Sequence, residues 1–249
     1  MITRDFHCHT TFCDGTNTPE EMVLASIEKG MTELGLLCHS HTFFDGRYCI
    51  TKEKVPQFLS EINRLKEKYA DKIKLYCGVE QDYYSDYPTD GFDYVIGSVH
   101  YMLIDGYYYS LDSKSEWFFD MMNKKFGGDY NRLAEVYYET AANVIEKTGA
   151  DIIGHFDIVS KWVENEDCSR IRQPEYLAIA KKAVDKLIPY EKSFEINVGA
   201  IARGLRTHPY PSAEIISYIK EKGGKLILSS DAHSKENLCY QFDKWEYLL

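Results

Sequence analysis

The chain has 249 residues, of which 44% are hydrophobic and 27% are charged, a composition typical of a folded globular protein rather than a disordered one. Its formal net charge of −10 argues against a nucleic-acid-binding surface, and it requires local positive charge wherever an anionic substrate binds. No apolar run approaches the ~20 residues that span a bilayer, and the N-terminus lacks the apolar core of a signal peptide.

We therefore expect a cytoplasmic protein without a membrane partner; the sequence indicates no particular oligomeric state. The seven cysteines are scattered and form no CxxC pair, which predicts free thiols in a reducing compartment. Cys8, Cys38 and Cys77 fall in apolar segments, where a cysteine is usually a small core residue.

Short apolar runs alternate with amphipathic stretches along the chain. The apolar runs predict buried strands at residues 4–8, 33–38, 73–79, 94–99, 151–154, 194–198 and 225–229. The amphipathic stretches predict helices from Thr18 to Gly30 and at 55–69, 133–147, 175–187 and 212–222. This alternation predicts a parallel α/β sheet, and a closed, barrel-like form is favoured because the chain has no glycine-rich nucleotide turn. No linker interrupts the pattern, so we expect residues 1–249 to form a single domain.

Residues 101–129 form a long, aromatic-rich interval between the predicted elements, with three tyrosines at 107–109 and the run Trp-Phe-Phe at 117–119. Two interpretations remain open. The interval is either an excursion that overhangs a functional site or a packed surface insertion.

Seven of the eight histidines lie at or just beyond the C-terminal end of a predicted strand. In parallel β/α barrels this rim builds the active site from residues on several different strands. His7 and His9 illustrate the pattern, because alternating side chains place both on one face of the first strand. The remaining histidine, His208, precedes a turn, and we expect it to be structural or exposed.

Carboxylates also lie at this rim. Together with the histidines they give nine candidate metal ligands: His7, His9, Asp14, His39, Glu80, His100, His155, Asp231 and His233. Nine ligands are too many for one ion and suit two or three divalent ions, with a carboxylate bridging. A mixed imidazole and carboxylate set without thiolate points to zinc, manganese or iron and argues against calcium. Such a cluster activates a water and clamps a phosphoryl group, and it provides the positive charge that the chain as a whole lacks.

Several motifs in order resemble those of the PHP (polymerase and histidinol phosphatase) family. They are DFHCHT at 5–10, CDG at 13–15, GLLCHSHT at 35–42, GVEQDY at 78–83, GSVH at 97–100, GHFD at 154–157, EIN at 195–197 and SSDAH at 229–233. The match spans residues 5 to 235. The segment GAIARG at 199–204, followed by YPS at 210–212, resembles the stand-alone histidinol-phosphatases of that family.

The resemblance implies a distorted (β/α)7 barrel of the PHP type with a site for two or three metal ions. It also implies hydrolysis of L-histidinol phosphate in histidine biosynthesis, with a metal-bound hydroxide as the attacking group. In that scheme His7, His9, Glu80 and Asp231 hold the first metal. Glu80 bridges to a second metal held by His100 and His155, and the third is held by Asp14, His39 and His233.

Three further roles are expected around the metals. Arg203 follows the Glu195 strand end and is the best candidate to bind phosphoryl oxygens. Asp231 could in addition transfer a proton to the leaving alkoxide or from the water. His41 stands where relatives often carry an aromatic residue, and it is expected either to contact substrate or to be an exposed loop histidine. Asp14 stands where some relatives use histidine, which leaves the identity or occupancy of one metal open.

Other functions remain compatible with this pattern. The same metal set would serve a phosphoesterase for another small phosphate monoester or a phosphodiester. A metal-binding domain without catalysis is a second alternative, although no ligand position is degraded. A metal-dependent amidohydrolase is a third, but those barrels generally carry a ligating lysine after a middle strand, and no lysine here directly follows a candidate strand end in that place.

Overall fold

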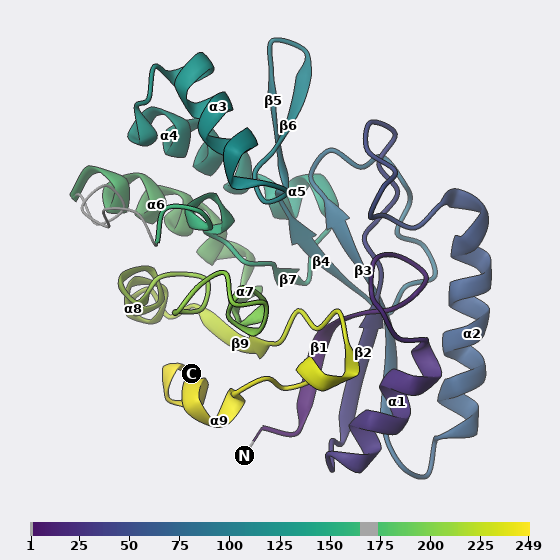
Figure 1. Ribbon diagram of the computed structural model, residues 1–249. Helices are drawn as coiled ribbons and strands as arrows, with labels where there is room; N and C mark the ends of the chain where they lie inside the picture. Colours follow the sequence, from purple (N-terminus) through teal and green to yellow (C-terminus); the bar gives the residue numbers. More distant parts are fainter. Residues whose placement is uncertain (1, 165–173) are drawn as a thin grey trace.

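The computed structural model describes residues 2–164 and 174–249 (Figure 1). Seven strands form one parallel sheet in the order β1-β2-β3-β4-β7-β8-β9. Their bounds are β1 Arg4–His9, β2 Glu33–Leu37, β3 Lys74–Asp82, β4 Tyr94–Ser98, β7 Ile152–Ile153, β8 Ser193–Asn197 and β9 Lys225–Ser229. The seven strands expected from the apolar runs are therefore all present, and they lie in the sheet in chain order.

The sheet curls until its first strand meets the segment that follows its last. The His9 N–H donates to the Ala232 carbonyl at 2.8 Å, and the Ala232 N–H donates to the His7 carbonyl at 3.0 Å. β1 and β9 are the edges of the sheet, so this contact closes the barrel beyond the C-terminal end of β9. The expected distorted (β/α)7 barrel is confirmed.

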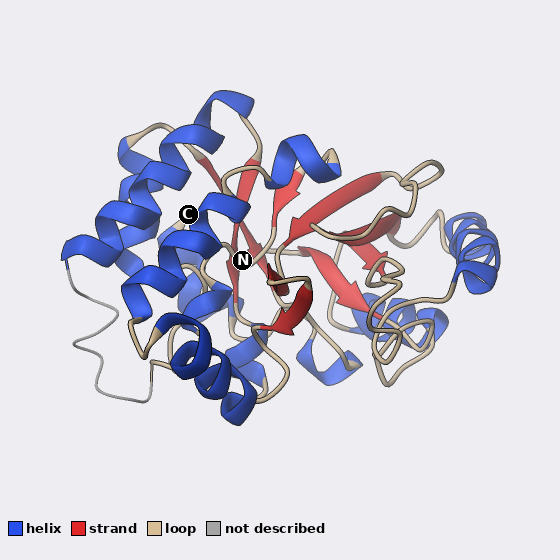
Figure 2. Cartoon of the chain, turned by 90° about the horizontal axis from the view of Figure 1, so that it is seen from above, coloured by secondary structure: helices blue, strands red, loops and turns tan. Residues whose placement is uncertain are grey.

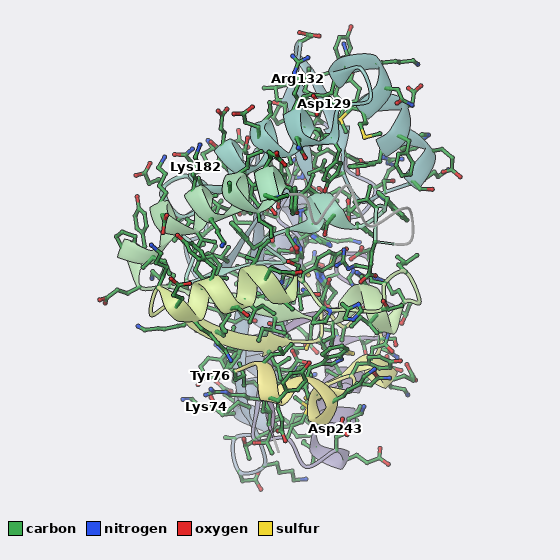
Figure 3. All side chains as sticks on the ribbon, turned by 90° about the vertical axis from the view of Figure 1, so that its left-hand side faces the viewer. Lys74, Tyr76, Asp129, Arg132, Lys182 and Asp243 are labelled. Atoms are coloured by element: carbon green, nitrogen blue, oxygen red, sulfur yellow. The ribbon has the colours of Figure 1, made fainter. Side chains whose placement is uncertain are left out.

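Helices lie around the outside of the curled sheet, as Figure 2 shows from above. They are α1 Pro19–Glu28, α2 Val55–Lys68, α3 Ser115–Phe126, α4 Tyr130–Ala141, α5 Val144–Thr148, α6 Pro174–Leu187, α7 Gly199–Ala202, α8 Ala213–Glu221 and α9 Phe242–Trp245. One hydrophobic core joins α1 and α2 to the first strands, and a larger core lies among α3, α4, α6 and α8. Asp129 and Arg132, at the start of α4, lie at the opposite end of the molecule from Lys74 and Tyr76 of β3 (Figure 3).

A tyrosine fills the inside of the barrel toward the N-terminal ends of the strands. The Tyr94 hydroxyl donates to the Phe6 carbonyl at 2.6 Å. A Cβ atom at Gly35 or Gly78 would collide with the Tyr94 side chain, so both strands need glycine at these points. Because this end is filled, the open space of the barrel lies at its C-terminal rim.

Residues 101–129 and one predicted helix take forms that the apolar pattern does not specify. Residues 101–129 form an antiparallel hairpin, β5 Tyr101–Ile104 with β6 Tyr107–Ser110, followed by α3. The single helix expected over 133–147 is instead divided into α4 and α5, with a turn in which the Asn143 N–H donates to the Thr140 carbonyl at 3.0 Å. A continuous apolar pattern does not show where a helix breaks when both halves pack on the same core.

The buried cysteines behave as expected. Cys8, Cys38 and Cys77 are buried free thiols, whereas Cys168 lies outside the described residues. Over the described part of the chain, the helices are all too short or too polar to cross a membrane.

Candidate functional site

The C-terminal ends of the strands surround a cavity of about 520 Å³. Seven of the nine candidate ligands line it: Asp14, His39, Glu80, His100, His155, Asp231 and His233. The other two, His7 and His9, are fully buried at the end of β1 and contact the same group of side chains. The structure therefore brings all nine candidate ligands together from different strands.

Glu80, at the middle of this group, is only 1% exposed and reaches imidazoles with both of its oxygens. Its Oε1 lies 2.9 Å from Nε2 of His155 and 3.2 Å from Nε2 of His100. Ser98 donates its hydroxyl to the same oxygen at 2.7 Å. Its Oε2 lies 2.8 Å from Nδ1 of His39. One carboxylate thus joins histidines carried by three different strand ends.

His7 and His9 face Glu80 from β1. Their Nε2 atoms are 3.2 Å apart and lie 3.3 Å and 3.4 Å from Oε2 of Glu80. Asp231 completes this group, because its Oδ1 lies 3.6 Å from Nε2 of His7 and 3.4 Å from Nε2 of His9. Asp231 has a positive φ of 48°, an unusual conformation that turns the chain just after β9.

A third group lies nearer the solvent around Asp14. Its carboxylate oxygens lie 3.7 Å from Nε2 of His39 and 3.3 Å from Nε2 of His233. His9 also belongs to this group, with its Nδ1 3.8 Å from Oδ1 of Asp14. The Asp14 side chain is 32% exposed, so this group is the most accessible to incoming ions or substrate.

These residues fit bound divalent cations. Oε2 of Glu80 is buried among three imidazole nitrogens, yet it accepts no hydrogen bond of proper geometry. The facing Nε2 atoms of His7 and His9 likewise suit a shared cation, which accepts a lone pair from each neutral ring. Imidazole nitrogens and carboxylate oxygens without thiolates are the donor set of zinc, manganese or iron.

The carboxylates of the site are held in their ionised form. Burial acts to raise the pKa of Glu80, but the neighbouring imidazoles of His39 and His100 outweigh it and keep that pKa well below its usual range. Burial also acts to raise the pKa of Asp231, but the positive charge of Arg203 and the neighbouring imidazole of His7 outweigh it and keep that pKa well below its usual range. Both side chains therefore present the charge that a metal ligand needs.

Two further carboxylates orient ligand histidines from behind. Glu195, fully buried in β8, lies 2.6 Å from Nδ1 of His7 through Oε1, and its Oε2 accepts the His155 backbone N–H at 2.9 Å. Asp82 contacts Nδ1 of His100 at 3.2 Å. A carboxylate on one ring nitrogen leaves the other nitrogen free and directs it to the metal site. The EIN motif at 195–197 contained this signal, because Glu195 lies at a strand end beside the other site residues.

Two basic side chains border the cavity beside the cluster. Arg203 follows α7, and its Nη2 donates to Oδ2 of Asp231 at 3.3 Å. Lys161, just beyond the short turn of helix at Ile158–Ser160, is 6% exposed and also lines the cavity. Lys161 was not among the residues expected from the sequence, because it lies six residues after His155 in an irregular segment rather than at the strand end. The two cations provide local positive charge in a chain of net charge −10.

His41 and His208 lie apart from this group. His41 is not among the residues that line the cavity, and its contact with substrate stays a prediction. His208 is an exposed histidine whose Nδ1 lies 3.1 Å from Glu164, as expected for a residue outside the site. The long interval 101–129 does reach the site, because Tyr101, Ser110 and Asp112 line the cavity.

Known proteins share sequence and fold with this chain. Residues 5–199 match the model of the PHP domain. A protein of Deinococcus radiodurans named "Probable histidinol-phosphatase" is 25% identical over 256 residues, which cover 96% of this chain and 89% of that protein.

Two solved structures share the fold over nearly the whole chain. A candidate histidinol phosphatase of Listeria monocytogenes has a TM-score of 0.82 at 22% identity, covering 97% of this chain and 99% of its own. The histidinol phosphate phosphatase of Lactococcus lactis, solved with zinc, L-histidinol and phosphate, has a TM-score of 0.75 at 23% identity, covering 99% of this chain and 92% of its own.

Replacing Glu195 with glutamine should weaken zinc binding about 10- to 100-fold, because the neutral amide holds the His7 ring less firmly than the carboxylate does. Competition with a chromophoric chelator measures the affinity. Glu191→Gln, which alters an exposed carboxylate four residues earlier, is the matched control and should bind zinc as the unaltered protein does. Equal affinity in all three proteins would show that Glu195 does not position His7.

Proposed function

The chain belongs to the PHP family, and from this premise we propose that it is a metal-dependent phosphomonoesterase that hydrolyses L-histidinol phosphate to L-histidinol and phosphate. The observation that carries the proposal is the convergence of nine imidazole and carboxylate ligands on one cavity that Arg203 and Lys161 also line. A site that combines metal ligands with fixed cations suits a phosphate ester, since phosphoryl transfer depends on positioning and on charge neutralisation. We assign residues 1–249 to one catalytic domain.

The known relatives narrow the substrate. The relative from Deinococcus radiodurans carries the name of a histidinol-phosphatase, and it covers almost all of this chain. The Lactococcus lactis enzyme, which shares the fold, was solved with the two products of that reaction and with zinc. L-Histidinol phosphate is therefore the first substrate to test. The cavity of about 520 Å³ is of the size that small-molecule sites have.

The three groups of ligands would hold up to three ions. His7, His9, Glu80 and Asp231 would hold one; Glu80 with His100 and His155 a second; and Asp14, His39 and His233 a third. Bound zinc, manganese or iron would lower the pKa of a coordinated water and withdraw charge from the phosphoryl oxygens.

Side chains of the protein would bind the phosphoryl group and transfer a proton. Arg203 and Lys161 bind the phosphoryl oxygens and hold the ester against the metal-binding wall of the cavity. Asp231 is ionised and its Oδ2 accepts a hydrogen bond from Arg203, so it would act first as a base toward the water and could then pass that proton to the leaving alkoxide.

Zinc- or manganese-loaded protein should release phosphate from L-histidinol phosphate, and removal of the metal by a chelator should stop the release until metal is restored. Steady-state phosphate release on a panel measures this, with other amino-alcohol phosphates and a cyclic phosphodiester beside L-histidinol phosphate. A much higher kcat/KM for another ester would favour the broader phosphoesterase alternative. Fully metal-loaded protein that hydrolyses no member of the panel would contradict the proposal.

Arg203→Ala and Lys161→Ala should each lower kcat/KM for L-histidinol phosphate about 10- to 100-fold, because a lost hydrogen bond to a charged group costs about 1.5–3 kcal/mol. Metal content, measured in parallel, distinguishes a lost phosphate contact from a lost metal ion. Arg132→Ala changes an exposed arginine of α4 outside the cavity and serves as the control. A kcat/KM within about twofold of the unaltered protein would remove the phosphate-binding role of the residue concerned.

A further inference from the structure

Five carboxylates line the cavity: Asp14, Asp45, Glu80, Asp112 and Asp231. Three of them belong to the candidate metal ligands described above. A fourth, Asp45, is bound on both oxygens, because Arg47 donates to Oδ1 at 2.8 Å and to Oδ2 at 2.6 Å. Tyr101 also donates its hydroxyl to Asp45 at 2.8 Å. Asp112 is thus the carboxylate of the cavity wall with the most hydrogen-bonding capacity left for a ligand.

Asp112 lies just after β6, where the hairpin interval meets the barrel rim. Its Oδ1 accepts the Ser110 hydroxyl at 3.3 Å, and its Oδ2 lies 3.7 Å from Nζ of Lys161. The shorter contact of Lys161 is to the Asp112 backbone carbonyl, at 2.8 Å. Trp162 donates its indole N–H to the Leu111 carbonyl at 2.8 Å and anchors the segment from the other side. The segment is therefore held by backbone contacts, and the carboxylate itself is weakly engaged.

The Asp112 carboxylate is charged and accessible. Its side chain is 30% exposed at the cavity. Burial acts to raise the pKa of Asp112, but the charge of Lys161, whose Nζ lies 3.7 Å from Oδ2, acts against it, and that pKa lies below its usual range. A negative charge therefore stands beside the cations that would hold the phosphate.

The proposed substrate carries two opposite charges close together. In L-histidinol phosphate the ammonium nitrogen is separated from the phosphate by two carbons and the ester oxygen. An ester held by Lys161 and Arg203 must therefore place its ammonium near those same cations and the metal cluster. Such surroundings repel an ammonium group unless a carboxylate accepts it. Asp112, next to Lys161, lies where that acceptor is needed.

Building on the proposed function, we propose that Asp112 binds the substrate's ammonium group and makes the site specific for phosphate esters of 2-amino alcohols. The segment that carries Asp112 then contributes to the binding of both charges of the substrate. The Asp112 carboxylate binds the ammonium group, and the Asp112 backbone carbonyl accepts a hydrogen bond from Lys161, which binds the phosphate. A site with a paired carboxylate discriminates against an analogue that lacks the ammonium, because the carboxylate is then left without a partner.

The test compares L-histidinol phosphate with its deamino counterpart, 3-(imidazol-4-yl)propyl phosphate, on the metal-loaded full chain. The unaltered protein should prefer the amino ester, and Asp112→Asn should lower kcat/KM for that ester about 10- to 100-fold while leaving the deamino ester unchanged. Asp112→Glu keeps the charge and should retain more of the preference than Asp112→Asn. Asp45→Asn makes the same change at the carboxylate already bound by Arg47, and it should keep the preference.

The other outcomes overturn either the inference about Asp112 or the phosphatase proposal. If Asp112→Asn loses kcat/KM equally on both esters and Asp112→Glu does the same, the residue acts only on Lys161 or on folding, and the inference is overturned while the phosphatase proposal stands. No preference in the unaltered protein, or an undiminished preference in Asp112→Asn, overturns the inference in the same way. Absence of turnover of L-histidinol phosphate by the unaltered, metal-loaded protein would instead refute the phosphatase proposal itself.

Discussion

The contact between the buried carboxylate of Glu80 and the imidazoles around it is the interaction on which the site depends. A carboxylate that is 1% exposed would carry a large desolvation cost if it were left alone. Here it is surrounded by histidines from β1, β2, β4 and β7 or the residues just after them. The C-terminal ends of these strands must therefore lie at the same edge of the sheet. The sheet must also curl enough to bring β1 next to the segment after β9.

Contacts behind, below and beside the cluster of candidate ligands orient its side chains and shape the cavity. Behind it, Glu195 and Asp82 hold ring nitrogens, so that the opposite nitrogens face the cavity. Below it, Tyr94 fills the barrel and leaves space only at the rim. Beside it, the segment after β6 carries Asp112, whose backbone carbonyl accepts a hydrogen bond from Lys161 at the cavity wall. The fold thus separates the candidate metal ligands, most of which lie at or just after strand ends, from the proposed substrate-binding groups, which lie in the connecting segments.

The strands and the convergence of the candidate metal ligands could be predicted from the sequence because each depends on a local pattern. A buried parallel strand is a short apolar run, and a ligand at its C-terminal end is the next polar residue, as with Glu80 after Gly78-Val79. Lys161 and Asp112 could not be assigned in this way. Both lie in irregular segments, and their meeting is set by the docking of the hairpin interval onto the rim, through Trp162 and Leu111. The break between α4 and α5 was missed for a similar reason, since packing rather than local pattern decides where that helix ends.

A crystal structure of the protein grown with zinc or manganese, with anomalous scattering recorded at the metal edge, tests the central claim most directly. The account predicts anomalous peaks among the imidazole and carboxylate groups, with Glu80 in contact with two of the ions through its two oxygens. Side chains that point to separate places, with no peak between Glu80 and the surrounding histidines in metal-saturated crystals, would contradict it.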